Sequence, residues 1–334
     1  MNIEQRPRLT EFCADFRPYI IDSDSTIGFQ MKMGSAVVLD ESYVPDADNK
    51  ITVRDIGRVG QQALWGVWPS GSITPQNNAF DYFAFYFNEV LDQTSRIIFS
   101  RARTRRSADA CGVLSQVTHK VTRLGAQEWV SGFPLSGAVI ANVQALVVGE
   151  IVGGRINNSS YTEIVTVEVS PETVAALLGI EADTMDSYTI QMANGTMTFL
   201  MDRQPLPQWW MFRCKNVYDM PETLIVRAAL TAKGANTSTS AAMFGIERKF
   251  AVEAADEYTA RSGHLHRQDE YLLWRDLLNA QEVQVWSGSE WLPVIIGSQR
   301  FDRDFKRNVV NSVEFSFKLA DPTQADLFEY DQHQ

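Results

Sequence analysis

Short runs of apolar, aromatic and β-branched residues dominate the hydrophobic pattern of this chain. The densest run, FDYFAFYF at 80–87, is apolar at nearly every position, which predicts a strand covered on both faces by packed sheets. Turn residues separate the runs, and Asn194-Gly195 is the strongest hairpin signal among them. Similar runs predict further strands at 97–99, 138–149, 163–169, 188–190 and 197–201.

Signals for helices are few and short. Ser170-Pro171-Glu172 supplies an N-cap residue, a proline at the first helical position and an acidic first turn, which predicts a helix over VAALLGI. A second segment, QDEYLLWRDLL at 268–278, carries its large apolar residues on one helical face. Both helices are minor features of a pattern that predicts a mainly β fold.

The strand-forming runs fall into three groups, which predicts tandem β-sandwich-like modules with a few short helices. The first module is expected at 1–95, the second at 96–203 and the third at 204–334. Gln204-Pro205-Leu206-Pro207 is expected to stiffen the last junction, because proline restricts the backbone.

The stretch ESYVPDADNKITVRDIG at 41–57 crowds three aspartates and an asparagine into a short segment. A calcium loop of the EF-hand type needs an oxygen ligand at its fifth position and glycine at its sixth. A loop beginning at Asp46 would place Lys50 and Ile51 at those positions. The sequence therefore favours a hairpin turn at 45–49 between strands at 37–43 and 51–54.

Composition narrows the class of partner. The chain has 334 residues, of which 45% are hydrophobic, enough to form two or three cores. A net charge of -11 argues against nucleic acid and against anionic membrane as partners. No apolar run is long enough to span a bilayer, and the segment MNIEQRPRLTEF lacks the apolar region of a signal peptide. Three cysteines far apart predict free thiols in a reducing compartment: Cys13, Cys111 and Cys214.

Motifs for catalysis and cofactor binding are missing from the sequence. It contains no G-x-S-x-G, P-loop, G-x-G-x-x-G or H-E-x-x-H pattern, so we predict no catalytic residue, metal or cofactor. His264 and His266 with Asp269 are an alternative metal set, against the simpler reading of a polar loop. Asp302 and Asp304 lie among basic residues, which favours a solvated salt-bridge lattice.

One basic segment stands out in this acidic chain: Arg101, Arg103, Arg105 and Arg106. Nucleic-acid binding would need interleaved aromatic residues or a wider basic face, and the segment has neither. A contact with an acidic surface on an identical neighbour, or a plain solvated loop, fits the sequence better.

Eight tryptophans are the other notable feature of the composition. Paired exposed indoles can stack on sugars or anchor interfaces, and packing within β-sandwich cores is the competing interpretation. Trp286 and Trp291 bracket Ser287–Glu290 and are expected to pair across two strands. The candidates for a glycan platform or an interface are Trp65, Trp68, Trp209 and Trp210.

The 41–57 stretch also resembles a segment of structural proteins encoded in the tail-gene regions of Bacteroidetes phages and prophages. In that segment a Y-x-P-D turn precedes a strand that ends in Asp-Ile-Gly. The matching residues here are Tyr43, Pro45, Asp46, Lys50, Ile51, Val53, Asp55, Ile56 and Gly57.

Three later stretches resemble the same family, and together the four cover about half of the chain at scattered points. The segment at 211–226 matches through Phe212, Asn216 and Pro221-Glu222-Thr223, although Tyr218-Asp219 replaces the Phe-Gly of the family. The segment at 257–286 is similar to one that joins a strand to a short helix. The segment at 290–324 is similar to the closing strands and to distal-tail and baseplate proteins in general.

The resemblance implies a virion tail or baseplate protein that assembles into a ring, hexameric by analogy, in contact with tail tube and hub proteins. It implies synthesis in a bacterial cytoplasm and no active-site residues. The first hypothesis from the sequence is therefore a structural, non-enzymatic subunit resembling distal tail proteins. The alternatives are a carbohydrate-binding β-sandwich module and a glycan-acting enzyme whose two carboxylates come from distant strands.

Overall fold

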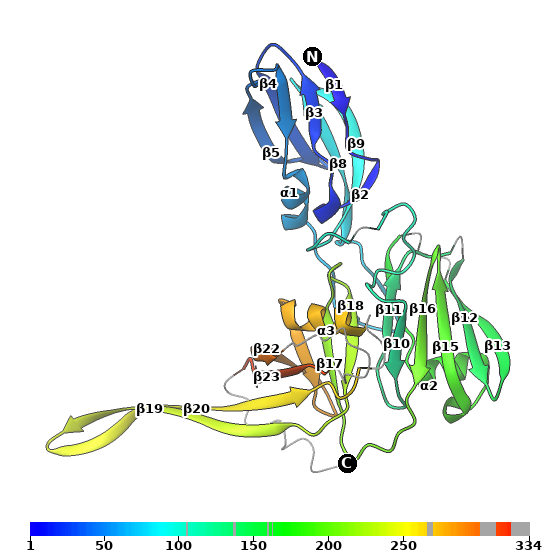
Figure 1. The fold of residues 1–334 in the computed structure, drawn as a ribbon, viewed down its shortest axis with the longest axis vertical. Helices are drawn as coiled ribbons and strands as arrows, with labels where there is room; N and C mark the ends of the chain where they lie inside the picture. The colour runs from blue at the N-terminus through cyan, green and yellow to red at the C-terminus, as the bar shows by residue number, and fades with distance from the viewer. Residues whose placement is uncertain are drawn as a thin grey trace.

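Strands form most of the regular structure of this protein. The computed structural model describes residues 1–104, 106–135, 138–158, 160–161, 163–265, 270–300 and 312–321. Three α-helices lie within these ranges, and the rest of the regular structure is β apart from two short 3-10 turns. The prediction of a mainly β fold with tandem sandwich-like modules is confirmed, as Figure 1 shows.

Two facing sheets form the module at the top of Figure 1, which we call the N-terminal sandwich. The smaller has the order β1-β3-β6 and the larger the order β2-β9-β8-β4-β5. Tyr19 from the smaller sheet meets Phe87 from the larger edge to face, with ring centroids 5.0 Å apart. The elements are β1 (Asn2–Gln5), β2 (Thr10–Phe12), η1 (Cys13–Asp15), β3 (Tyr19–Asp22), β4 (Ile27–Met33), β5 (Ala36–Tyr43), β6 (Lys50–Val53), α1 (Ile56–Gln62), β8 (Phe80–Phe87) and β9 (Val90–Ile98).

The hairpin predicted at 37–54 is wrong, although its turn is real. Asp46 organises the turn, because its carboxylate accepts hydrogen bonds from the backbone N–H groups of Asp48 and Lys50 at 2.9 and 2.8 Å. The two flanking strands nevertheless belong to different sheets: β5 pairs with β4, and β6 pairs with β3. The turn therefore carries the chain from one layer of the sandwich to the other.

The prediction that 80–87 is covered on both faces is also wrong. Phe83, Phe85 and Phe87 are buried between the two sheets, whereas Tyr82 is 51% exposed. Tyr86 lies on the same outer face, where the Lys32 ammonium sits 4.4 Å from its ring centroid. Because residues on the outer face are also aromatic, the sequence does not show the apolar–polar alternation that is typical of a half-buried strand.

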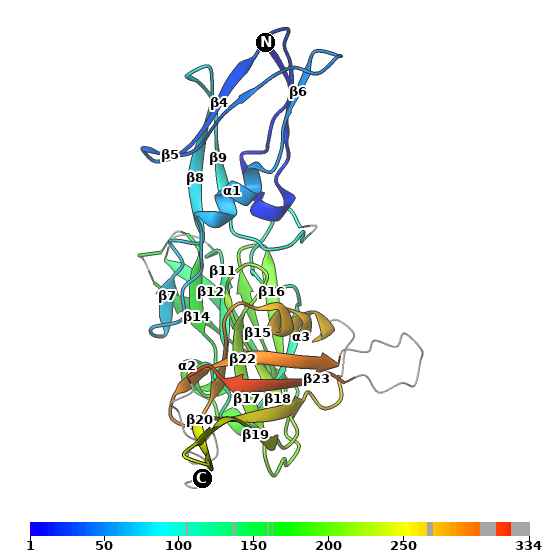
Figure 2. The same cartoon turned by 90° about the vertical axis from the view of Figure 1, so that its left-hand side faces the viewer.

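The chain leaves the N-terminal sandwich after α1 and returns to it at β8. Between them, β7 (Ile73–Pro75) pairs antiparallel with β14 (Val165–Glu168), which also pairs with β11 (Trp129–Gly132). The sandwich thus uses residues 2–62 and 80–98, and β9 continues past the predicted boundary at residue 95. Figure 2 shows β7 with β14 in the lower part of the molecule, which we call the body.

A five-stranded sheet, the middle sheet, forms one side of the body in the order β10-β16-β15-β12-β13. The predicted Asn194-Gly195 hairpin is confirmed between β15 and β16, but Gly195 itself pairs with Met192 inside the ladder. A Cβ at position 195 would lie 2.4 Å from the backbone nitrogen of Val113, so close packing explains this glycine. The strands are β10 (His119–Thr122), β12 (Val139–Val147), β13 (Glu150–Asn157), β15 (Met185–Met192) and β16 (Gly195–Met201).

A seven-stranded sheet, the C-terminal sheet, completes the body in the order β18-β17-β21-β22-β23-β20-β19. Its last two strands extend far beyond the others as a hairpin, visible at the lower left of Figure 1. The strands are β17 (Trp210–Lys215), β18 (Pro221–Val226), β19 (Thr231–Met243), β20 (Ile246–Arg261), β21 (Val283–Trp286), β22 (Trp291–Arg300) and β23 (Glu314–Leu319).

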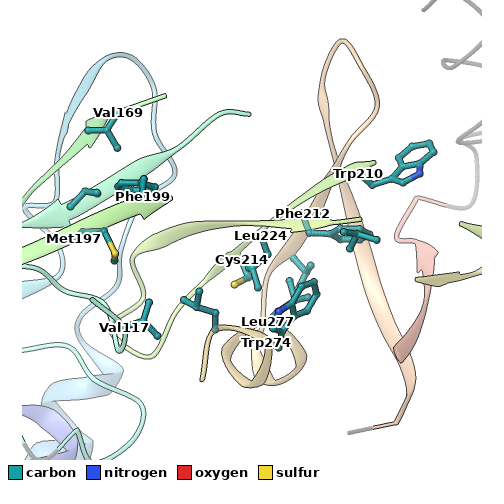
Figure 3. Close-up of a cluster of buried hydrophobic side chains, with 14 of the residues drawn as sticks. Val117, Val169, Met197, Phe199, Trp210, Phe212, Cys214, Leu224, Trp274 and Leu277 are labelled. Carbon is teal, nitrogen blue, oxygen red and sulfur yellow. The ribbon is translucent and has the colours of Figure 1, made fainter. Parts of the chain in front are cut away.

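The middle and C-terminal sheets share one hydrophobic core. Met197 and Phe199 of β16 belong to the same buried cluster as Phe212 of β17, and Figure 3 shows side chains from both regions together with Trp274 and Leu277. The expected second and third modules are therefore packed on each other rather than joined by an exposed linker. We therefore treat the two sheets as one unit, the body.

Both predicted helices are present. The first is α2 (Pro171–Leu178), with proline at its first position and Gly179 ending it at φ 67°. Ser170 makes no cap hydrogen bond to the helix; its hydroxyl instead accepts the N–H of Glu128 at 3.1 Å. The second is α3 (Glu270–Asn279), whose residues Trp274 and Leu277 enter the shared core. A short 3-10 turn, η2 (Ala182–Thr184), precedes β15.

A fully buried ion pair joins β10 to the residue that precedes β11. The Lys120 ammonium of β10 donates to Glu128 Oε2 at 2.6 Å, and the two side chains are 3% and 0% exposed. Burial raises the pKa of Glu128, and the lysine charge opposes that effect. Two charges so fully removed from water depend on each other for their stabilisation.

The loop between α1 and β7 docks on the C-terminal sheet through polar contacts. The Lys215 ammonium donates to the carbonyl of Gly66 at 2.9 Å and to Glu282 Oε1 at 3.1 Å. The Gly66 N–H donates to Asp219 Oδ2 at 2.8 Å, and the Trp68 indole N–H donates to Glu282 Oε2 at 2.7 Å. These bonds hold the segment that leads from α1 to β7 against the C-terminal sheet.

Candidate functional site

Three tryptophan rings surround the guanidinium of Arg213 on β17. The Arg213 Cζ atom lies 4.5 Å from the ring centroid of Trp291, 4.7 Å from that of Trp68 and 5.7 Å from that of Trp129. Its Nε donates to Gln284 Oε1 at 2.6 Å. Cation–π attraction is strongest where the cation is desolvated. Burial lowers the pKa of Arg213 to about 10, which leaves the group charged at neutral pH.

The arginine therefore joins three parts of the chain that are far apart in sequence. Trp68 comes from the docked loop, Trp129 from β11 and Trp291 from β22. Trp68, one of the four tryptophans singled out in the sequence, is thus engaged within the chain through both its ring and its N–H.

The other three tryptophans predicted from the sequence lie in different surroundings. Trp210 is buried in the shared core, where Figure 3 labels it. Trp209, its neighbour, lies immediately before β17 and under the Arg123 guanidinium, which is 5.1 Å from its ring centroid. Trp65 is 52% exposed. Trp65 and Trp68 therefore do not form one exposed platform, since only Trp68 lies against Arg213.

Trp209 and Trp210 line one groove together with a tryptophan from a distant segment, Trp286. The groove has a volume of about 460 Å³, and the segments 206–208 and 287–288 form much of its rim. Trp286 and Trp291 are register partners across β21 and β22, with centroids 5.3 Å apart, so their predicted cross-strand pairing is confirmed. Sequence reasoning assigned Trp286 only to that pair and missed its place in the groove.

The arginine segment is partly used inside the chain. Arg101 donates to the carbonyls of Lys215, Asn216 and Asn279 at 2.5, 2.7 and 3.1 Å. Arg106 donates to the carbonyls of Val113 and Ser115 at 3.1 and 2.6 Å. Arg103 is exposed, and Arg105 lies outside the described residues. Of the three that the structure describes, Arg103 has the exposure that a contact with a neighbouring molecule requires.

A buried carboxylate, Asp276 of α3, lies close to the bonds made by Arg101. Its oxygens accept hydrogen bonds from the Gln116 amide at 2.7 and 2.9 Å and from the Val217 N–H at 3.3 Å. Burial is the main cause that raises the pKa of Asp276 to about 6, and the nearby Glu222 carboxylate raises it further. The group therefore titrates in the mildly acidic range while it holds α3 against two loops of the body.

We expect this titration to make the body more stable in mild acid. A folded-state pKa above the ordinary value of 3.8 means that the native state binds the proton more tightly than the unfolded chain. The stabilisation that comes from protonated Asp276 is complete below the ordinary pKa of 3.8, and it is lost as pH rises through about 6. Between about pH 5 and about pH 7.5 it lowers the unfolding free energy by about 1 kcal/mol.

Urea unfolding followed by tryptophan fluorescence at several pH values measures this slope. Asp276→Asn keeps an oxygen for the Gln116 amide but has no proton to lose, so its curve should be flatter than the wild-type curve. Glu11 and Glu128, whose pKa values burial also raises, are unchanged in the variant and contribute equally to both curves. Equal slopes for the two proteins would refute the assignment.

The hairpin formed by β19 and β20, which we call the arm, extends away from the body, as Figure 1 shows. Of the two, β20 pairs with β23 only through Tyr258–Arg261, and β19 is the edge strand of its sheet. At the tip, Phe244 is 96% exposed and Ile246 58%. At about 3.4 Å per residue, the 13 residues of β19 span about 44 Å.

Several sequence candidates fall outside the described residues. They are His266 and Asp269 of the alternative metal set, Asp302 and Asp304, and the basic residues beside them. Within the ranges that the structure covers, no group of three or more histidine, cysteine or acidic side chains could hold a metal ion. No helix in those ranges combines the length and apolar character that crossing a bilayer requires. The three cysteines are buried and unpaired with one another.

Comparison with known proteins gives no relative that identifies this fold. No family model matches the chain, and no curated protein matches it. Among solved structures it aligns with the extracellular region of plexin A4, domains 1 to 10. That alignment has 6% identity and a TM-score of 0.18, and covers 95% of this chain and 31% of the plexin chain. An overlap this weak does not indicate a common fold.

Proposed function

We propose that this chain is a structural subunit of a tailed-phage virion, placed at the tail tip or baseplate, that assembles with copies of itself into a ring. The observation that carries the proposal is the arm, a long hairpin that extends beyond its sheet and is tipped by the exposed side chain of Phe244. The subunit works by its shape and surfaces, and the proposal assigns it no catalytic step.

The arm supports assembly because an extended hairpin alone is only marginally stable in water. The unpaired edge of β19 presents backbone N–H and C=O groups that a neighbouring strand can complete, a common mode of protein association. An exposed aromatic side chain at a tip is also typical of an anchor residue at an interface. Both features favour a partner that covers the arm.

Charge favours a second copy as that partner. The tip carries Glu247, Arg248 and Lys249, so basic groups outnumber acidic ones there, whereas the whole chain has a net charge of -11. A basic tip is attracted to the acidic surface of an identical neighbour. A head-to-tail contact of this kind closes into a ring when the rotation between subunits allows it.

The placement in a phage tail rests on the resemblance of four sequence stretches to tail-region proteins. Asp46, one of the residues that carry it, organises the turn between the two sheets of the N-terminal sandwich. Pro221, Glu222 and Thr223 carry another part and begin β18. The resemblance thus falls on residues that define turns and strand ends of the fold. Mass spectrometry of purified virions from a host that carries the gene tests this placement: the chain should be present among tail proteins.

We expect removal of the arm to abolish self-assembly and leave the body folded. Ala235 and Ala255 are register partners, so replacing 236–254 with an Asn-Gly turn closes a shorter hairpin without shifting its base. Analytical ultracentrifugation should show oligomers for the wild type and monomers for the shortened chain. Circular dichroism and the urea midpoint should agree for both, because the shared core does not include the arm tip.

A pair of point variants sharpens this test. Phe244→Ser should weaken association about tenfold or more, as expected for the loss of an anchor residue. Val148→Ser is the matched control, because Val148 is 81% exposed at a different hairpin tip. A wild-type chain that stays monomeric at every soluble concentration, or oligomers that persist without the arm, would overturn the proposed mode of assembly.

A further inference from the structure

The geometry points to the groove between Trp209 and Trp286 as a binding site for an uncharged saccharide, with the sugar ring held against indole surfaces. This inference is independent of the arm and of self-assembly. It rests on the position, rigidity and charge of the side chains that line the groove.

Two partly exposed indoles from separate segments line the groove, next to the buried ring of Trp210. Trp209 lies at the end of the Pro-rich junction, immediately before β17, and Trp286 ends β21. Beneath them is a small apolar cluster formed by Ala126, Met211 and Ile225, against which both tryptophans pack. Aromatic rings on an apolar floor offer the flat, weakly hydrated surface on which the C–H face of a pyranose stacks.

Contacts within the chain hold both rings in place. The Arg123 guanidinium lies 5.1 Å from the ring centroid of Trp209, and the Trp291 ring centroid lies 5.3 Å from that of Trp286. Trp291 is itself fixed, because its indole N–H donates to Gln127 Oε1 at 3.1 Å. Side chains that are already ordered lose little entropy when a ligand binds, which favours recognition of a weakly binding ligand such as a sugar.

The remaining lining supplies hydrogen-bonding groups without charge. Gln208 contributes an amide that can both donate and accept, and Gly288 lines the groove with its backbone alone. Among the described residues that line the groove, none carries an ionisable side chain. A neutral, polyhydroxylated ligand matches this combination, whereas a uronic or sialic acid would find no cation in the lining and a strongly acidic protein around it.

Isothermal titration calorimetry with neutral gluco-, manno-, galacto- and N-acetylglucosamine oligosaccharides tests the inference, after a glycan array has selected the best of them. Trp209→Ala and Trp286→Ala should each weaken binding about tenfold or more, since each removes one stacking surface. Trp209→Phe should recover part of the affinity, which a merely structural role would not require. Trp65→Ala is the control, because Trp65 is exposed outside the groove and its loss should leave binding unchanged.

Three results would overturn the inference. One is the absence of binding to every neutral saccharide. The second is binding that survives both alanine variants while the urea midpoint shows that they are folded. The third is preference of the same groove for a proline-rich peptide or for an acidic sugar over any neutral sugar. None of these results bears on the arm, whose test is the oligomeric state.

Discussion

Lys120→Met is expected to lower the unfolding free energy of the body by about 3–5 kcal/mol, a large part of the stability of a typical domain. The substitution keeps most of the side-chain volume and removes the ammonium that lies 2.6 Å from Glu128 Oε2. Glu128 is fully buried, so its carboxylate would remain in a low-dielectric interior without its cation. The loss should shrink in mild acid, where Glu128 can take up a proton.

Tryptophan fluorescence in urea reports on the body alone, because all eight tryptophans lie between residues 65 and 291 and none lies in the strands of the N-terminal sandwich. Arg261→Met is the matched control within the body: it also breaks an ion pair, with Glu314, but at an exposed site where little change is expected. The double variant Lys120→Met/Glu128→Leu should recover much of the lost stability. A Lys120→Met variant as stable as wild type would show that the buried pair contributes nothing.

Gly66→Ala is expected to destabilise the body by about 1–3 kcal/mol, the range of overpacked interiors. A Cβ at position 66 would lie 1.9 Å from the carbonyl oxygen of Asp219, and a backbone atom cannot move aside as a flexible side chain can. The loop must therefore withdraw, which breaks the bonds from Lys215 to Gly66 and from Trp68 to Glu282.

Gly71→Ala provides the control in the same loop, because nothing lies within 4 Å of its added Cβ. It should be neutral or slightly stabilising, since alanine restricts the unfolded chain. The urea midpoint measures both variants, and the near-ultraviolet circular dichroism of the indoles reports whether Trp68 has left Arg213. If the two alanine variants were equally stable, the loop would not be docked as described.

The sequence predicted local structure better than it predicted which strands pair. Pro171 and Gly179 mark the two ends of α2, and the Asp46 turn was recognised from its residue types, because such signals act within a few positions. Neither signal says which sheet the next strand joins. The two strands beside the Asp46 turn consequently were assigned to one hairpin, although they lie in different sheets.

The groove and the arm escaped sequence reasoning for different reasons. Trp209 and Trp286 are brought together only by the pairing of β17 with β21, a contact between distant segments. In the arm, β19 consists mainly of small and polar residues. Sequence signals for strands depend on alternating apolar residues, so they miss a strand of this composition. The Trp286–Trp291 pair was predictable because its residues flank one short turn.

Between α1 and β8 the chain leaves the N-terminal sandwich and enters the body, and this path has a mechanical consequence. The polypeptide crosses between the N-terminal sandwich and the body three times: after α1, before β8 and after β9. Three covalent tethers resist bending and twisting far better than one, so a pull along the long axis of the molecule would be divided among them. A ribosome must also deliver the segment that carries β7 before it delivers β8 and β9, so the sandwich can close only after that segment has been synthesised.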